Sequence, residues 1–229
     1  LIISLTLLAS FTCAAETVTK GMKKVIDDAL DFSVKQSMSM FYEMKDQKGI
    51  LPRTAENGKM ITCESAWWTS GFYPGTLWYC YEYSNDPQIR AAAEEMTSRV
   101  EKQKYTTSNH DVGFIINCSF GNGYRLTHNE TYRKVIETAA KSLSTRFHPV
   151  TGCTRSWNSK KWQFSVIIDN MMNLELLNVA SSLTGDNTYY NMAKSHADRT
   201  MINHFRPDGS SYHVVSYDTI TGKVLNQVT

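Results

Sequence analysis

The chain has 229 residues, of which 41% are hydrophobic, and its 24 basic and 22 acidic side chains leave a formal net charge of +2. This length and apolar content are sufficient for one sizeable core. The nearly balanced charge, without a basic stripe or an acidic tail, argues against a nucleic-acid-binding protein.

The first residues, LIISLTLLASFTCAAE, form an apolar run that ends in small side chains. This pattern is typical of a secretory signal peptide, with cleavage expected after Ala15. Lipoprotein processing at Cys13 fits less well, because Phe11 and Thr12 precede it. The run is short for a membrane span, and no other stretch qualifies. We therefore expect residues 1–15 to direct export, to a periplasm or to the cell exterior.

Residues 22–44 carry the first amphipathic helical pattern of the chain. Three apolar segments without a broad polar face follow: AWWTSGFYPGTLWYCYEYS, HDVGFIINCSFGNGYRLT and IIDNMMNLELLNVASSLT. Each leads through a turn into an amphipathic segment: SNDPQIRAAAEEM, THNETYRKVIETAA and TGDNTYYNMAKSHA. The apolar segments are predicted to be buried inner helices and the amphipathic ones an outer layer. Residues 165–183 form an apolar run that is predicted to be helical and in which a carboxylate, Asp169, stands where a core residue would be expected.

The three turns resemble one another and carry Asp86, Asn129 and Asp186, which are good helix N-cap residues. Their spacings of 43 and 57 residues favour a repeated helix pair over a repeated strand. The fold class is therefore predicted to be all-α, an α/α toroid. The best strand signal is SSYHVVSYD, which a turn at TGK follows.

Three residues share a place in this repeat. Trp68 lies 18 residues before Asp86, Asp111 lies 18 before Asn129, and Asp169 lies 17 before Asp186. If the helix pairs surround one axis, these three residues gather at one end of the ring. Two carboxylates and an indole would then face a common cavity.

A structural role for the two inner acids is the alternative. Asp111 and Asp169 could cap their own helices, and capping would produce the same register. An ionised carboxylate in an apolar run must in any case be paired or hydrogen-bonded. The four cysteines after the leader and the six scattered histidines show no spacing typical of a metal site.

Several stretches resemble glycoside hydrolase family 88, the unsaturated glucuronyl hydrolases: WTSGFYPGTLWYCYEYSND, NHDVGF, TRSWN, IDNMMNL and DGSSYHVVSYD. The resemblance extends from about Trp68 to Asp218. It implies an (α/α)6 barrel that needs no metal or organic cofactor. It also implies oligosaccharide substrates, released by polysaccharide lyases, that end in a C4=C5 unsaturated uronic acid. The enzyme would remove this sugar by hydrating its vinyl ether.

By this resemblance, Asp169 in IDNMMNL corresponds to the general acid/base and Asp111 in HDVGF to the second essential acid. Trp68 and Trp157 correspond to aromatic walls of the sugar site, with a core position as the alternative for each. His110 would donate a hydrogen bond to the sugar, or would be a buried structural residue. His213 corresponds to a pocket histidine, or is a strand residue that faces solvent.

The family pattern continues beyond Thr229, and only about four helix pairs can be counted in the chain. We therefore expect residues 16–229 to be the N-terminal part of one (α/α)6 catalytic domain, in a fragment whose own activity is open. The substrate class expected from the resemblance is glycosaminoglycan oligosaccharides. The alternatives are unsaturated rhamnogalacturonides on the same fold, and a non-catalytic helical module that binds glycans.

Overall fold

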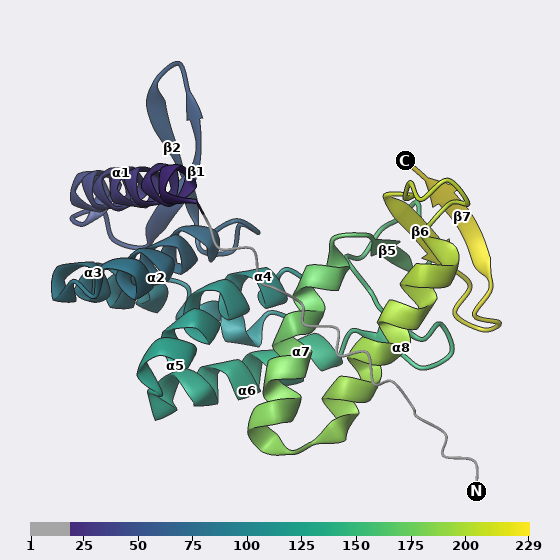
Figure 1. Cartoon of the computed structure of the whole chain (residues 1–229). Coiled ribbons are helices and arrows are strands. Elements are labelled where there is room, and N and C mark those ends of the chain that lie inside the picture. The colour runs from purple at the N-terminus through teal and green to yellow at the C-terminus, as the bar shows by residue number, and fades with distance from the viewer. Residues whose placement is uncertain (1–18) are drawn as a thin grey trace, which may run out of the picture.

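The computed structural model describes residues 19–229, so the predicted signal peptide lies outside the described residues. Helices dominate this part of the chain (Figure 1). They are α1 (Lys20–Met44), α2 (Phe72–Ser84), α3 (Pro87–Ser98), α4 (Val112–Ile116), α5 (Asn122–Thr127), α6 (Glu130–Ser144), α7 (Asn170–Thr184) and α8 (Asn187–Asn203). A π-helical segment, Asn117–Gly121, joins α4 to α5, so that these three pieces form one inner rod.

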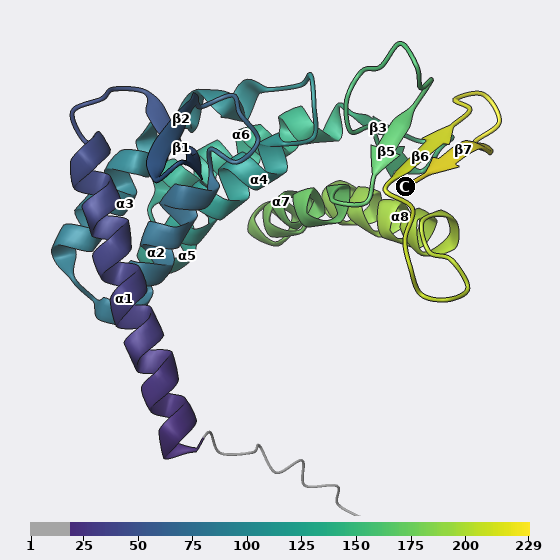
Figure 2. The same ribbon diagram turned by 90° about the horizontal axis from the view of Figure 1, so that it is seen from above.

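Inner and outer helices alternate along the chain, as the sequence predicts. The inner layer consists of α2, the rod from α4 to α5, and α7, whereas α1, α3, α6 and α8 lie outside it. Viewed from above, the helices form an open arc, with α1 at one end and the strands β5 to β7 at the other (Figure 2). The predicted α/α toroid is confirmed as an arc of helix pairs.

The three turns between inner and outer helices are built alike. Each has a left-handed residue, Asn85, His128 or Gly185, whose N–H closes the inner helix on a carbonyl four residues earlier, at 2.8 Å. The next residue then caps the outer helix with its side chain. These caps are Asp86 on Gln88 N at 2.7 Å, Asn129 on Thr131 N at 2.9 Å, and Asp186 on Thr188 N at 2.8 Å. The predicted capping turns are confirmed.

Three small antiparallel sheets accompany the helices. They are formed by β1 (Ile50–Glu56) with β2 (Lys59–Glu64), by β3 (Phe147–His148) with β4 (Cys153–Thr154), and by β5 (Ser165–Ile167) with β6 (Val214–Tyr217) and β7 (Val224–Val228). The β1–β2 hairpin is not among the elements predicted from the sequence. Its signal is Asn57-Gly58, where both residues have positive φ, as a tight hairpin turn requires.

The strand signal near residue 214 is confirmed by β6 and β7, with the turn at Gly222. The prediction of one helix over residues 165–183 is wrong at its start. Residues 165–167 form β5, and Val166 pairs with Val215 in β6. β-Branched side chains pack well on a pleated surface, and here a strand from a distant segment provides one. Helix α7 therefore starts only at Asn170.

Close packing brings the starts of the inner helices together. Gly113 in α4 lies so near α7 that an added Cβ would be 2.5 Å from Asn173 Oδ1. A Cβ on Gly71, just before α2, would collide with the Ile115 carbonyl of α4. The largest core cluster lies where α4, α6 and α7 meet, with Ile116, Ile136 and Leu177 fully buried in it.

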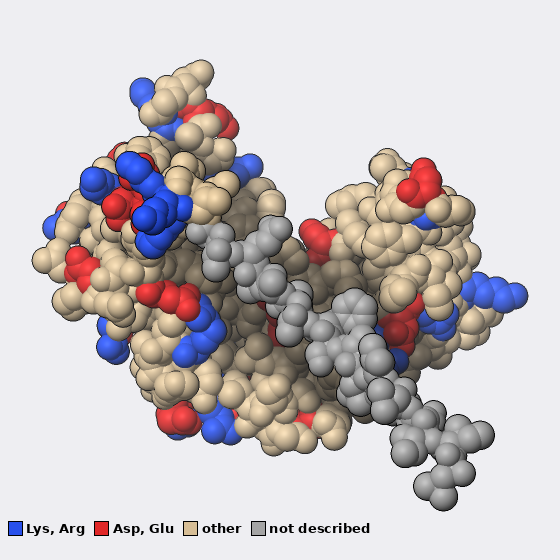
Figure 3. Space-filling view, in the orientation of Figure 1, with Lys and Arg blue, Asp and Glu red and all other residues tan. Residues whose placement is uncertain are grey.

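The space-filling view shows Lys, Arg, Asp and Glu side chains of both signs interspersed over the visible face (Figure 3). The same view shows a deep hollow between the part that carries β1 and β2 and the part that carries β6 and β7. Among residues 19–229, no helix combines the length and the apolar character needed to cross a bilayer.

Candidate active site

Asp111 and Asp169 occupy the N-cap positions of α4 and α7, but neither side chain forms a cap hydrogen bond. The side chain of Asp111 is 22% exposed and that of Asp169 38% exposed. The capping alternative is therefore wrong for both residues. Their carboxyl groups are half-buried and turned away from the helix starts that their positions would let them cap.

Other groups satisfy the N–H groups that these acids leave free. Asn173 in α7 reaches across to α4, where its Oδ1 accepts the N–H of Phe114 at 2.7 Å. In α7, the Ile168 and Asp169 carbonyls accept the N–H groups of Met171 and Met172. Because an unsatisfied buried N–H is costly, these substitutes allow the two aspartates to serve another purpose.

Four separate segments converge behind the acids. The His110 N–H donates to the Ser156 carbonyl at 2.9 Å, and Asn109 forms a β-bridge with Trp157. Ser156 Oγ in turn accepts the N–H of Ile167 at 2.9 Å. The N–H of Ile168 donates to the His213 carbonyl at 3.0 Å. The motifs HDVGF, TRSWN, IDNMMNL and SSYHVV, scattered along the sequence, thus meet at one place.

His110 is the centre of this arrangement. Its ring is 2% exposed, and Nε2 lies 3.3 Å from Asp111 Oδ1 and 3.7 Å from Asp169 Oδ1. Asp111 Oδ1 and Asp169 Oδ1 are therefore at most 7.0 Å apart. Asp169 Oδ1 is buried and forms no hydrogen bond. The structure thus brings together the two acids that the repeat register pairs.

The surroundings raise the pKa of both acids. Burial, and then the nearby Asp169 charge, raises the pKa of Asp111 to about 6, although Arg146 opposes this effect. Burial also raises the pKa of Asp169, while His213 opposes it. Two acids that share one site hold on to a proton more tightly than a solvated carboxyl group does.

The pKa of His110 shifts in the opposite direction. Burial lowers the pKa of His110 to about 4, and Arg146 contributes in the same sense, whereas Asn170 opposes it. Arg146 is itself 8% exposed and is held by the Arg155 carbonyl at 2.8 Å and the Thr107 carbonyl at 2.6 Å. The site therefore combines a neutral imidazole, two acids that favour protonation, and a buried cation.

Trp68 lies in the turn before α2, three residues before the N-cap Gly71, and not at the helix start that the repeat register predicts. The indole is still near the site, since its ring centre lies 6.1 Å from that of Phe114. Phe114 in turn lies 6.3 Å from the His110 ring.

The exposure of the tryptophans separates core from surface. Trp78 is fully buried and donates to Thr97, whereas Trp68 is 43% exposed. A core position is therefore wrong for Trp68, whose indole is open to solvent. Trp157 is half-buried beside Asn109. His213 is exposed and directly precedes β6, with its ring close enough to Asp169 to affect the pKa of that acid.

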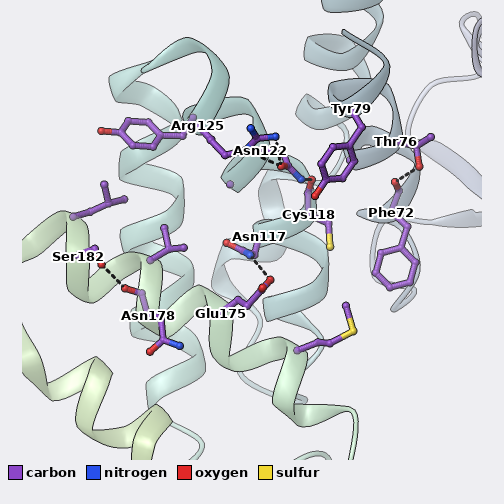
Figure 4. Close-up of a pocket in the computed structure, with 16 residues that line it drawn as sticks. Phe72, Thr76, Tyr79, Asn117, Cys118, Asn122, Arg125, Glu175, Asn178 and Ser182 are labelled. Atoms are coloured by element: carbon purple, nitrogen blue, oxygen red, sulfur yellow. Dashed lines mark hydrogen bonds between the residues drawn. The ribbon is translucent and has the colours of Figure 1, made fainter. Parts of the chain in front are cut away.

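A cavity of about 1070 Å³ follows the concave face of the inner helices (Figure 4). At one end it is lined by Phe72, which packs on Trp68 and Phe114, and by Met172 in the first turn of α7. Midway along it Asn117 donates to Glu175 at 3.1 Å, and Tyr124, Val179 and Leu183 also line the cavity. The two acids are not among its lining residues, so the cavity extends from the site without containing it.

The part of the chain that the structure describes contains no cluster of three or more His, Cys, Asp or Glu side chains suited to a metal ion. No protein-family model matches the chain. Individual proteins do match. The unsaturated glucuronyl hydrolase of Formosa agariphila is 47% identical over 165 residues, which are 71% of this chain and 41% of the relative. The unsaturated chondroitin disaccharide hydrolase of Streptococcus pyogenes is 33% identical, over 89% of this chain and 52% of the relative.

Solved structures agree with these relatives. The crystal structure of an unsaturated glucuronyl hydrolase specific for heparin superimposes with a TM-score of 0.81 at 43% identity, over 87% of this chain and 55% of that one. The chain belongs to the unsaturated glucuronyl hydrolase family. Another member, from Bacillus sp. GL1, gives a TM-score of 0.77 at 28% identity, over 90% of this chain and 54% of that one. The chain spans about half the length of the curated relatives it matches.

Sequence reasoning missed two residues that lie beside the acid pair. Asn170 lies inside the motif IDNMMNL, directly after Asp169, but no repeat or spacing marks it. Arg146 lies in the ordinary stretch STRFHP and becomes significant only when it is buried beside Asp111. No local pattern would have identified Arg146.

Proposed function

We propose that this protein removes the unsaturated glucuronic acid from the non-reducing end of oligosaccharides that lyases release from glycosaminoglycans. The observation that carries the proposal is the meeting of Asp111 and Asp169 on one nitrogen of a buried histidine. Relatives named unsaturated glucuronyl hydrolase and unsaturated chondroitin disaccharide hydrolase support it.

The proposed reaction hydrates the C4=C5 double bond, which is a vinyl ether. Asp169 gives its proton to C4, and positive charge develops at C5 and the ring oxygen. A water molecule adds its oxygen to C5 while its proton passes to the Asp169 carboxylate. The resulting hemiketal opens and releases the remaining saccharide, so that one water is consumed and the acid regains its proton.

The electrostatics of the site support these roles. A general acid must keep its proton near working pH, and burial raises the pKa of both carboxyl groups. As Asp169 loses its proton, the developing cation lies near two carboxyl groups, which stabilises the transition state. In this scheme Asp111 orients and polarises the reacting groups.

Aromatic side chains supply the surroundings that a sugar ring needs. Trp68 is exposed and supported by Phe72 and Phe114, so its face is available for stacking. We assign Trp157 to a second wall and His213 to a hydrogen bond with the sugar. His110 is too buried to bind the sugar directly, and we propose that it contacts Asp111 and Asp169 instead.

Chondroitin, hyaluronan and heparin fragments all contain the required end group. We propose glycosaminoglycan fragments because the relatives are named for chondroitin disaccharide and for heparin. A non-catalytic glycan-binding module would have no use for a pair of acids that retain protons.

The test is a turnover assay on the protein as its gene encodes it. Unsaturated chondroitin and heparin disaccharides should lose the ultraviolet absorbance of their double bond, and Asp169→Asn should abolish this loss. Binding of the disaccharides without any change in absorbance would overturn the proposal and favour the binding module. Turnover of unsaturated rhamnogalacturonide alone would change the substrate class.

We also propose that the protein is exported, on the apolar run of residues 1–15 alone. N-terminal sequencing of the mature protein from its native cell fraction tests this proposal. A new N-terminus near Glu16 in a periplasmic or extracellular fraction is expected, and an intact leader on a cytoplasmic protein would refute it.

A further inference from the structure

Behind the acid pair lie several buried polar atoms without hydrogen-bond partners. They are His110 Nδ1, Asn170 Oδ1, His196 Nε2 and Thr154 Oγ1, on side chains that are linked through Thr154 and Ser156. Leaving a buried polar group unsatisfied is costly, so these side chains are under pressure to find partners among their neighbours. Those that already make a hydrogen bond fix the directions open to the others.

Thr154 fixes two of the side chains. Its N–H donates to His196 Nδ1 at 2.9 Å, which makes that nitrogen the acceptor and puts the proton of the neutral ring on Nε2. Its carbonyl accepts the amide N–H of Asn170 at 2.8 Å. Because a carbonyl can only accept, the amide of Asn170 cannot be flipped, and its oxygen must point elsewhere.

His110 lies beside this amide. Its backbone N–H donates to the Ser156 carbonyl, and Ser156 Oγ lies 3.4 Å from Asn170 Nδ2. The Asn170 side chain also favours the protonated form of the His110 ring, as an acceptor does. Nε2 of His110 already faces the two acids, and Nδ1 has no other partner. Asn170 Oδ1, an acceptor, and His110 Nδ1, the ring nitrogen that does not face the acids, are thus buried atoms without partners on neighbouring side chains.

We propose that Asn170 is a positioning residue whose amide oxygen accepts the Nδ1 proton of His110, leaving Nε2 as a lone pair that faces Asp111 and Asp169. A lone pair cannot form a favourable contact with two carboxylates. One of the acids must therefore hold a proton and donate it to Nε2. In its resting state the site stores one proton on the acid pair.

The charged and titratable groups around His110 agree with this arrangement. They are Asp111 and Asp169 on one side, Arg146 near Asp111, and His196 behind the ring. Burial lowers the pKa of His110 to about 4 and raises the pKa of Asp111 to about 6. Between these values the proton resides on the acid pair and not on the ring. Its use as the proton added to C4 rests on the proposed function.

The first test is the tautomer of His110 in the uniformly ¹⁵N-labelled protein without substrate. Long-range ¹H–¹⁵N correlation spectra near pH 5 distinguish a ring protonated at Nδ1, at Nε2 or at both, and His110→Gln identifies the signal. A proton on Nδ1 is expected. A proton on Nε2, with His196 donating to Nδ1 instead, would overturn the proposal, as would a doubly protonated ring.

A matched pair of variants separates positioning from packing. Asn170→Asp replaces the acceptor by a carboxylate and should raise the pKa of His110 by about 1 to 3. Asn173→Asp adds a carboxylate one turn further along the same helix, at an equally buried site that contacts Phe114. Asn173→Asp should leave the pKa of His110 unchanged. Equal shifts of the His110 pKa in the two variants would refute a specific role for Asn170.

Kinetics supply a readout that a packing role would not move. In Asn170→Asp the His110 ring is protonated and donates from Nε2 to the acids. The acid pair then loses its proton at lower pH, so the basic limb of the plot of kcat against pH shifts to lower pH. KM for unsaturated chondroitin disaccharide should stay within a few-fold. A uniform loss of kcat without a shift of the profile would argue against the proposal. An inactive wild type with the Nδ1 tautomer would refute the proposed function but leave this inference standing.

Discussion

Acidic and amide side chains occupy two kinds of helix start in this molecule, with opposite consequences. At the outer helices, Asp86, Asn129 and Asp186 cap the backbone. At the inner helices, Asp111 and Asp169 occupy the same N-cap position without capping. The hydrogen bonds to Thr188 lower the pKa of Asp186, whereas burial raises the pKa of Asp111.

This contrast shows that a helix position does not decide what an aspartate does. The outer caps are exposed and bind the nearest N–H. The inner acids are desolvated, and Asn173 from a neighbouring helix has taken over the capping of α4. Because Asp111 does not cap α4, its carboxyl group is free to share a proton with Asp169.

The largest expected effect concerns Asp169. Asp169→Asn should reduce turnover about 10⁴-fold, because an amide cannot donate and recover the proton. The melting temperature should not fall, since no cap bond is lost. The measurement is the loss of double-bond absorbance, with circular dichroism as the folding control.

Asp186→Asn is the matched control at an outer helix start. Asn caps as well as Asp, so this variant should retain wild-type turnover and fold. Substantial turnover in Asp169→Asn, or an equal loss in Asp186→Asn, would break the distinction between the two kinds of helix start.

Asp111→Asn should reduce kcat about 10²- to 10³-fold while the fold is retained. The physical reason is the loss of one of the two carboxyl groups that face the developing positive charge. Steady-state kinetics and thermal melting measure the two effects. If the variant instead melts much earlier at full specific activity, Asp111 is a structural residue.

The pH dependence of stability sharpens the comparison. Because the folded-state pKa of Asp111 is about 6, compared with the ordinary 3.8, the native state binds more protons between these values. This group's contribution to stability is thus present at low pH and is lost as the pH rises through about 6.

His110 acts in the opposite sense, because its pKa is lowered from 6.5 to about 4. Its contribution to stability is lost as the pH falls through this window. The difference in unfolding free energy between wild type and Asp111→Asn, measured by urea titration, isolates the acid. We expect the wild type to lose stability relative to the variant as the pH rises from 4 to 6, and the reverse trend would contradict the raised pKa.

The smallest expected effect is at an outer cap. Asn129→Ala removes the hydrogen bond to the Thr131 N–H and should cost about 1 kcal/mol of stability. Turnover per folded molecule should not change, because Asn129 lies at the opposite end of the inner rod from Asp111. Asn129→Asp should restore the stability. A specific loss of turnover in Asn129→Ala would show that the N-terminal ends of the outer helices also contribute to activity.

Much of the fold could be predicted from local patterns. Apolar and amphipathic segments separated by capping turns predict the alternation of α2, α3, α6, α7 and α8, because these signals act over one or two helical turns. The Asn57-Gly58 hairpin was predictable in the same way and was missed. Strand β5 was not predictable, because its partner β6 lies about fifty residues further along the chain.

The site, too, could be predicted only in its local features. The shared register marks Asp111 and Asp169 as special, but it cannot tell a cap from a proton donor. That distinction depends on whether the N–H of Phe114 finds another acceptor and whether His110 is buried between the two carboxyl groups. Both depend on contacts between segments that lie far apart in the sequence.

The sequence by itself determined the helix pairs, their turns and the outer caps, because short-range hydrogen bonds and hydrophobic periodicity are local properties. Only the tertiary structure decided that two aspartates meet on one imidazole and that Asn170 and Arg146 surround them. The reason is that desolvation and charge proximity, which set the protonation of these groups, arise from neighbours that only folding supplies.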